Sequence, residues 1–148
     1  METSQNPEEF FQVLEVLIER NGLSIDRPKG SSHPRFPQLI YPMDYGFING
    51  TQSQDGEGID VFLGDLQSHR GDPQDHRIGM QDHRKNLQGH HVVGVLCSID
   101  REKRDSEVKV LVDCTEENIR TALKMLNHGP MRAVLLRRFP NGEGEHQQ

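Results

Sequence analysis

The sequence predicts an α+β domain in which a small closed, OB-like β barrel is flanked by an N-terminal and a C-terminal helix. Apolar stripes of helical period occur near each end of the chain, and the segments between them are short apolar runs separated by Gly and Pro. The order helix, several strands, helix, strand lacks the alternation of βαβ units. The length of 148 residues fits one domain spanning residues 1–148.

Both helices carry start and stop signals. Asn6 and Pro7 supply an N-cap and a first-turn proline, and the helix is expected to end near Gly22. Thr115 is the expected N-cap of the second helix, over residues 116–128, and Gly129 its stop. The apolar stripes are Phe10, Val13, Leu14, Leu17 and Ile18 in the first helix, and Ile119, Ala122, Leu123 and Leu126 in the second.

Short apolar runs give the strands. Runs over 23–25, 39–41 and 47–48 read as short pieces of sheet, and residues 59–63 as a full strand. The runs 92–99 and 108–112 are joined by a charged connection, which favours a β-hairpin. A last strand is expected over 131–137.

A seven-residue repeat lies between the two halves of the predicted sheet, in the form GDLQSHR, GDPQDHR, IGMQDHR, KNLQGHH. Pro73 and several glycines oppose a coiled coil, so we interpret the repeat as a polar loop insertion at about 67–90. Its regular histidines could suggest a metal site, but without a helix nothing places them on one face.

Charge and composition exclude several classes of partner. A net charge of -6 lacks the basic footprint of a surface for nucleic acid or an anionic membrane. No apolar run reaches membrane-spanning length, and the acidic start does not resemble a signal peptide, so we expect a cytoplasmic protein. Cys97 and Cys114 form no CxxC pair and are predicted to be buried, inert thiols.

The segment Asp55-Gly56-Glu57-Gly58-Ile59-Asp60 places three carboxylates within six residues at the entry of a strand. Oxygen ligands converging from such a turn suit Mg²⁺, and glycine permits the tight backbone path. An exposed acidic turn is the alternative. An EF-hand fits poorly, because its glycine and distal glutamate are not at the required offsets.

The preceding segment, Tyr41-Pro42-Met43-Asp44-Tyr45-Gly46-Phe47-Ile48 followed by Gly50-Thr51, decides between these alternatives. Together with the acidic run it resembles the family I inorganic pyrophosphatases, which carry YPxNYGxIxxT before DxDPxDV. The resemblance implies their fold and metal-dependent hydrolysis of inorganic pyrophosphate, with Mg²⁺ as cofactor and homo-oligomers as a possibility. Three departures stand out: Asp44 replaces asparagine, Glu57 replaces aspartate, and Gly58 replaces proline.

The resemblance also assigns candidate residues. The second acidic segment of the family corresponds to residues 100–109 here, with a register that is ambiguous by about two residues. Candidate metal ligands are Asp55, Glu57, Asp60, Asp100, Glu102, Asp105 and Glu107. Candidate catalytic residues are Asp55, Glu57, Tyr45 and Lys109, and candidate substrate-binding residues are Arg27, Lys29, Arg35 and Arg132, with His33 a weaker one.

Two other functions remain open from the sequence. A shortened basic segment before Tyr41 could admit a larger phosphoanhydride, such as a nucleotide, although no base-reading feature is visible. The altered acids could instead hold a metal or phosphate without turnover, because phosphoryl transfer depends on the positions of charged groups.

Overall fold

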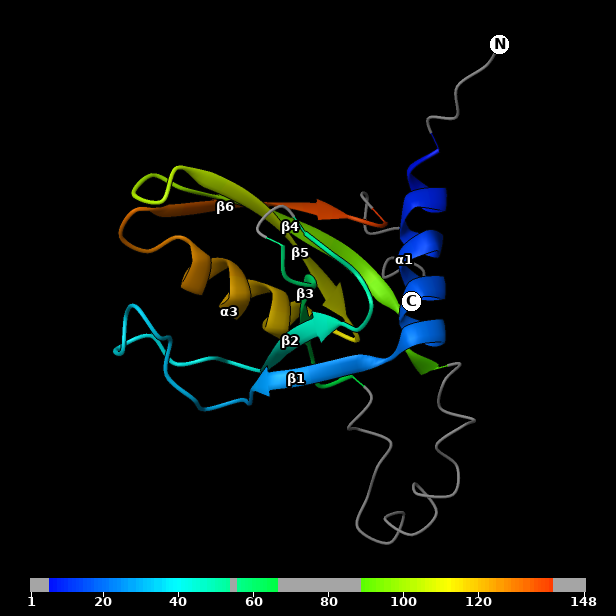
Figure 1. Cartoon of the computed structure of the whole chain (residues 1–148), viewed down its shortest axis with the longest axis horizontal. Helices are drawn as coiled ribbons and strands as arrows, with labels where there is room; N and C mark the ends of the chain where they lie inside the picture. The colour runs from blue at the N-terminus through cyan, green and yellow to red at the C-terminus, as the bar shows by residue number, and fades with distance from the viewer. Residues whose placement is uncertain (1–5, 54–55, 67–88, 140–148) are drawn as a thin grey trace, which may run out of the picture.

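The computed structural model describes residues 6–53, 56–66 and 89–139, and it contains two helices and six strands in this part of the chain (Figure 1). The elements are α1 (Pro7–Asn21), β1 (Leu23–Arg27), β2 (Asp44–Ile48), β3 (Ile59–Leu63), β4 (Val92–Asp100), β5 (Asp105–Val112), α3 (Glu116–Leu126) and β6 (Met131–Arg137). The predicted α+β class and element order are confirmed.

The six strands form one sheet in the order β1-β2-β3-β5-β4-β6. Neighbouring strands are antiparallel except for β3 and β5, which are parallel. Between the described residues of β1 and β6 there is no strand pairing, so the sheet is not closed by hydrogen bonds and the predicted closed barrel is not confirmed. On the outer edge of β6, the side-chain amide of Asn127 bonds the backbone N–H and C=O of Ala133 instead.

The two helices pack on opposite faces of the sheet. Phe11, Leu14 and Ile18 of α1 belong to one buried cluster with Val110 and Val112. Ile119, Ala122, Met125 and Leu126 of α3 belong to a second cluster with Leu111. Because side chains alternate along a strand, Lys109 and Glu107 lie on the α3 face with Leu111.

Helix caps follow the sequence signals. The Asn6 side chain accepts a hydrogen bond from the Glu8 backbone N–H, and Thr115 forms a capping box with Asn118. Helix α3 ends at Leu126, two residues earlier than predicted, because Asn127 turns its side chain to β6. Residues 39–41 form only an isolated bridge between Ile40 and Ser32.

Most of the seven-residue repeat lies outside the described residues, but both of its ends are tied to the end of β5. Leu66 N–H donates to the Asp113 carbonyl, and Asp113 N–H donates to the His91 carbonyl. The Asp113 carboxylate is fully buried and bonds His90 Nδ1 at 2.7 Å and the His91 N–H at 2.8 Å.

Two remaining predictions from composition have different outcomes. Cys114 is buried but Cys97 is exposed on β4, so the prediction of two buried thiols is wrong for Cys97. Neither described helix is long and apolar enough to cross a membrane.

Candidate active site

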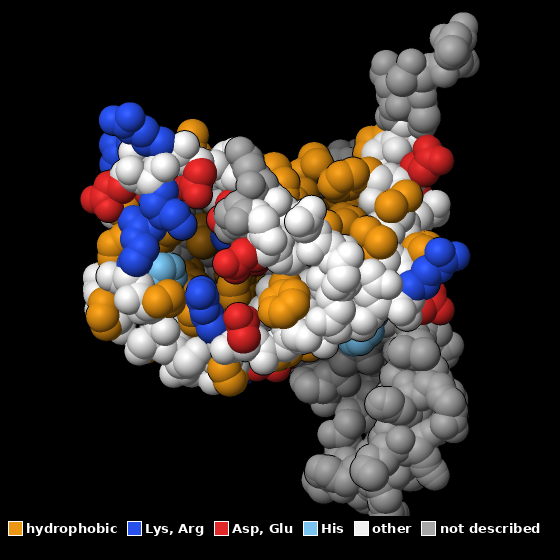
Figure 2. All heavy atoms as spheres, viewed as in Figure 1, with side chains coloured by type: hydrophobic (Ala, Val, Ile, Leu, Met, Phe, Trp, Pro, Cys, Tyr) orange, Lys and Arg blue, Asp and Glu red, His pale blue; other side chains and the backbone are white. Residues whose placement is uncertain are grey.

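A pocket of about 560 Å³ opens beside the α3 face of the sheet. Figure 2 shows acidic and basic side chains gathered around a hollow in the left half of the visible face. The acidic residues of the pocket are Asp26, Glu57, Asp60, Asp100, Asp105 and Glu107, and its basic residues are Arg27, His33, Arg35, Lys103 and Lys109.

Lys109 lies at the centre of the site. Its ammonium donates to Tyr45 Oη at 2.8 Å, to Asp60 Oδ2 at 3.1 Å and to Glu107 Oε1 at 2.6 Å. The parallel register pairs Asp60 with Lys109 across β3 and β5, and Glu107 precedes Lys109 by two residues on the same face. The sheet itself therefore brings the two carboxylates to one cation.

Burial dominates the electrostatics of this group. It raises the pKa of Asp60, and Lys109 offsets that effect only in part. Burial also raises the pKa of Tyr45, which is a neutral phenol at physiological pH. For Lys109 burial acts in the opposite direction, but its anionic neighbours prevail and its pKa is raised. Two carboxylates thus share one permanently charged ammonium, and the group is short of positive charge.

The rim of the pocket is held by ion pairs between distant segments. Arg35 bonds Asp100 at 2.7 Å and Glu102 at 3.1 Å. Asp100 also accepts the backbone N–H groups of Glu102 and Lys103, which fixes the β4–β5 turn. The hydrogen bond from Arg35 lowers the pKa of Asp100. The carboxylate of Asp100 is therefore occupied as a structural acceptor in this arrangement.

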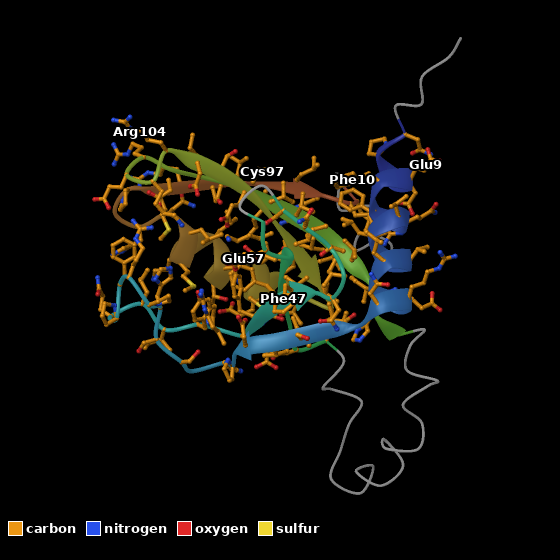
Figure 3. The ribbon with its side chains drawn as sticks, viewed as in Figure 1. Glu9, Phe10, Phe47, Glu57, Cys97 and Arg104 are labelled. Atoms are coloured by element: carbon orange, nitrogen blue, oxygen red, sulfur yellow. The ribbon has the colours of Figure 1, made fainter. Side chains whose placement is uncertain are left out.

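Gly46 on β2 and Gly58 just before β3 line the pocket and allow the close backbone approaches found there. A Cβ atom at Gly46 would lie 1.8 Å from the Ser24 carbonyl oxygen, so β1 and β2 can approach only with glycine there. A Cβ atom at Gly58 would lie 2.7 Å from Phe47 Cδ2. Figure 3 shows Phe47 and Glu57 beside one another near the middle of the view. The aromatic ring thus occupies the space that a proline at position 58 would need.

Most of the candidate residues line the pocket, but not all. Lys29 and Arg132 do not: the Lys29 ammonium is 3.9 Å from Asp65, and Arg132 donates to the carbonyls of Gly129 and Met131. Glu102 contacts the rim through Arg35 and is exposed. Asp55 lies outside the described residues.

Sequence reasoning missed several residues of the pocket, among them Lys103, Tyr41 and Asp26. Lys103 lies at the tip of the β4–β5 turn, 3.8 Å from Asp105, where the sequence indicates only a charged connection. Tyr41 accepts a hydrogen bond from Arg27 Nη1 at 2.8 Å, and its place at the start of the Tyr-Pro segment was an available signal. Asp26 precedes Arg27 and carried no separate signal.

The acidic residues of the pocket have the oxygen donors that a hard divalent cation prefers, since Glu57, Asp60, Asp105 and Glu107 all line it. Within residues 6–53, 56–66 and 89–139, however, no three His, Cys, Asp or Glu side chains are grouped closely enough to hold an ion. The ammonium of Lys109 bonds both Asp60 and Glu107 and lies between them.

Comparison with known proteins connects this pocket to a family. A family model described as inorganic pyrophosphatase matches residues 12–139, from α1 to the end of β6. The chain belongs to the inorganic pyrophosphatase family. The match includes every described residue of the pocket and all six strands, so it extends well beyond the segment from Tyr41 to Asp60.

A single relative of this inorganic pyrophosphatase family member matches a smaller part of the chain than the family model does. It is similar to inorganic pyrophosphatase 2 of Pseudomonas syringae pv. tomato, with 36% identity over 62 residues. That match covers 38% of this chain and 34% of the relative, about a third of the relative's length.

Two solved structures of inorganic pyrophosphatases are also similar. The protein from Neisseria gonorrhoeae has 15% identity and a TM-score of 0.48, with 87% of this chain and 90% of that chain covered. The protein from Thermus thermophilus has 16% identity and a TM-score of 0.47, with 82% of this chain and 84% of that chain covered.

Proposed function

We propose that this chain hydrolyses inorganic pyrophosphate to two phosphates with Mg²⁺ as its cofactor. The observation that carries the proposal is the shortage of positive charge at the centre of the pocket, where Asp60 and Glu107 share Lys109. Such a centre attracts divalent cations, while the cations of the rim suit an anionic substrate. Family membership supports the same activity.

Six carboxylates in the pocket and at its rim divide into two groups. Asp60 and Glu107, with Glu57 and Asp105 beside them, are the residues that would hold magnesium. When bound there, magnesium supplies charge neutralisation and a water of lowered pKa. Asp100 and Glu102 act through Arg35 to shape the turn, and we assign them no direct ligation.

The chain's own residues would orient and neutralise the substrate. Water attacks one phosphorus, the bridging P–O bond breaks, and Glu57 or Asp55 accepts the proton of the water. Arg27 and Lys103 face the pocket with donors to spare, since Arg27 bonds a neutral phenol and Lys103 lies 3.8 Å from its nearest carboxylate partner. They would stabilise the charge that moves to the leaving phosphate.

Tyr45 and Lys109 have a different part in this scheme. Both are buried and bonded to one another, so they hold the geometry of the centre. As a neutral phenol, Tyr45 has one proton to donate in a hydrogen bond, which the carboxylate of Asp60 takes here; a phosphate oxygen that reaches the centre would receive it in place of Asp60.

A phosphate-release assay tests the proposal. Purified protein with pyrophosphate and magnesium should release two phosphates per substrate, and a chelator should abolish the release. Parallel assays with a nucleoside triphosphate examine the rival substrate class. Release from the triphosphate alone, or none from either compound, would contradict the proposal.

Location and assembly complete the proposal. The described cysteines are free thiols, which is compatible with the reducing cytoplasm that we propose as the location. We propose no nucleic-acid or membrane partner, because the net charge is -6. A homo-oligomer is compatible with the apolar side chains exposed on β4 and β6, such as Ile99, Val134 and Leu136.

A further inference from the structure

His33 lines the pocket but has no part in the scheme above. It lies in the segment between β1 and β2. Its Nδ1 accepts hydrogen bonds from the backbone N–H groups of Arg35, at 3.0 Å, and Phe36, at 3.2 Å. Both bonds need a lone pair on Nδ1, so the proton of the neutral ring is on Nε2. The backbone of its own segment therefore selects the tautomer.

Aromatic neighbours hold the ring in this orientation. The imidazole is stacked on Tyr41, with the ring centroids 6.0 Å apart and the planes at 9°. Phe36 contacts it from its own segment at 5.3 Å. Since Nδ1 faces the segment backbone, the Nε2 edge of the ring is directed away from that backbone. Among the described residues, Nε2–H has no hydrogen-bond partner, so the pocket contains a positioned, unused donor.

The surroundings keep this donor neutral. Burial lowers the pKa of His33, and so do the positive charges of Arg27, Arg35, Lys109 and Lys103, to about 4. These charges come from β1, from the His33 segment itself, from β5 and from the β4–β5 turn. A positive charge on the ring would be opposed from each side, whereas an anion would be attracted by the same four groups.

We propose that His33 binds the substrate directly, by donating Nε2–H to an anionic oxygen of the phosphoryl group that lies between Arg27 and Lys103. The proposal rests on the proposed function of the pocket, and it gives His33, a weaker substrate-binding candidate from the sequence, a specific donor atom and a specific role. A neutral donor contributes a charge-assisted hydrogen bond without forming an ion pair with the nearby carboxylates. A hydrogen bond to a charged group stabilises by about 1.5–3 kcal/mol, which corresponds to roughly tenfold or more in affinity.

Asparagine provides a sharp test, because its Oδ1 can replace Nδ1 as acceptor for the two backbone N–H groups while the distal donor is lost. Binding of methylenediphosphonate, a non-hydrolysable pyrophosphate analogue, is measured by titration calorimetry in magnesium buffer. His33→Asn should raise the Kd about tenfold or more. The matched control is His128→Asn, because His128 also contacts the Phe36 ring, in an edge-on geometry, but does not line the pocket. Its Kd should equal that of the parent.

A Kd for His33→Asn within about twofold of the parent, or an equal loss in both variants, would overturn the proposal. Should the variant not fold, nitrogen NMR of the parent's imidazoles replaces it. His33 should carry its proton on Nε2 from about pH 5 to 8, and the Nε2–H signal should shift on addition of the analogue. The opposite tautomer, or no shift at saturation, would equally refute the role.

These measurements separate the two proposals. They record binding and need no turnover. A parent protein that binds the analogue through His33 but releases no phosphate from pyrophosphate would refute the hydrolase proposal alone. A parent protein that hydrolyses pyrophosphate, but in which His33→Asn leaves the Kd unchanged and the Nε2–H signal does not shift, would refute only the role of His33.

Discussion

Asp60 and Asp113 are both carboxylates withdrawn from solvent beside β5, but they have different partners. Asp113 has donors of its own, the ring of His90 and the backbone N–H of His91. Asp60 hydrogen-bonds the Tyr45 hydroxyl but must share its one cation, the ammonium of Lys109, with Glu107, and its side chain is 25% exposed to the pocket. The difference separates a carboxylate that holds the chain together from one that retains unbalanced charge for an incoming cation.

The largest effect is expected from a substitution at Asp60, in the centre of the pocket. Asp60→Asn keeps the shape of the side chain and removes its charge, so hydrolysis of pyrophosphate should fall roughly tenfold to a thousandfold. The fold should survive, because burial already disfavours the charged carboxylate and raises its pKa. Phosphate release gives the rate and circular dichroism the fold. Glu117→Gln, at an exposed ion pair on α3, is the control. More than about a tenth of the parent rate in Asp60→Asn would refute the assignment.

Asp113→Asn should have the opposite effect to Asp60→Asn: it should lower stability and leave the hydrolysis rate unchanged. Asparagine tolerates the backbone φ of 51° at this position, so the change tests the charge and not the backbone. Weakening the bonds to His90 and His91 should lower the free energy of unfolding by about 1–3 kcal/mol. Urea unfolding measures the loss. The rate per folded molecule should stay at the parent value; a large drop in that rate would remove the distinction between the two carboxylates.

Shortening the repeat tests whether Asp113 needs a histidine partner from the repeat. Deletion of residues 70–90 removes three repeat units and joins His69 to His91, so His69 takes the sequence position of His90. The variant should fold, keep the activity of the parent, and gain about 1 kcal/mol in stability from the shorter loop. Thermal unfolding and phosphate release measure both. Adding His69→Ala to the deletion should reverse the gain, because Asp113 then loses its imidazole partner. An insoluble or inactive deletion variant would instead show that the repeat is needed for folding or for hydrolysis.

The smallest effect concerns pH. The pKa of His33 is lowered to about 4, below its usual value of 6.5, so between these values the unfolded chain binds more protons than the folded one. Stability should therefore fall as pH drops from about 6.5 to 4, and His33→Asn should reduce this fall. Because the ring is only half-buried, we expect less than about 1 kcal/mol after solvent screening. Urea unfolding at several pH values is the measurement, and identical pH profiles for parent and variant would contradict it.

Local patterns account for what the sequence could predict. Helix caps and the β4–β5 hairpin follow from short motifs, and spacing along β5 puts Glu107 and Lys109 on one face. Asp60 is 49 residues from Lys109 and meets it through the parallel pairing of β3 and β5, so its place in the same pocket was expected only from the family resemblance. The position of Arg35 could not be predicted, because it depends on Asp100, which is 65 residues away. Barrel closure, which also depends on distant segments, is not confirmed: among the described residues β1 and β6 do not pair, and Asn127 bonds the backbone of Ala133 on the outer edge of β6.

Lys29 and Arg132 lie outside the pocket and Lys103 lines it, and one cause explains why the sequence did not predict this. All three are long cations in or beside turns, where residue type does not fix direction. Their orientation depends on the nearest acceptors: Asp65 for Lys29, and backbone carbonyls for Arg132. Periodicity carries no information about such contacts, so the strands of the site were predictable and its rim was not.

The contact between Gly58 and Phe47 limits the order in which this site could be altered. Replacing Gly58 by proline would restore the family motif, yet the new ring would collide with Phe47, whose Cδ2 is 2.7 Å from an ideal Cβ at position 58. A smaller residue at 47 would remove that collision, but the new Cβ would still lie 3.0 Å from the Cβ at 47 and 3.1 Å from the Ile48 carbonyl oxygen. The two positions are therefore epistatic: the same substitution is more harmful with phenylalanine at 47 than with a smaller residue there, and a protein engineer must change both together.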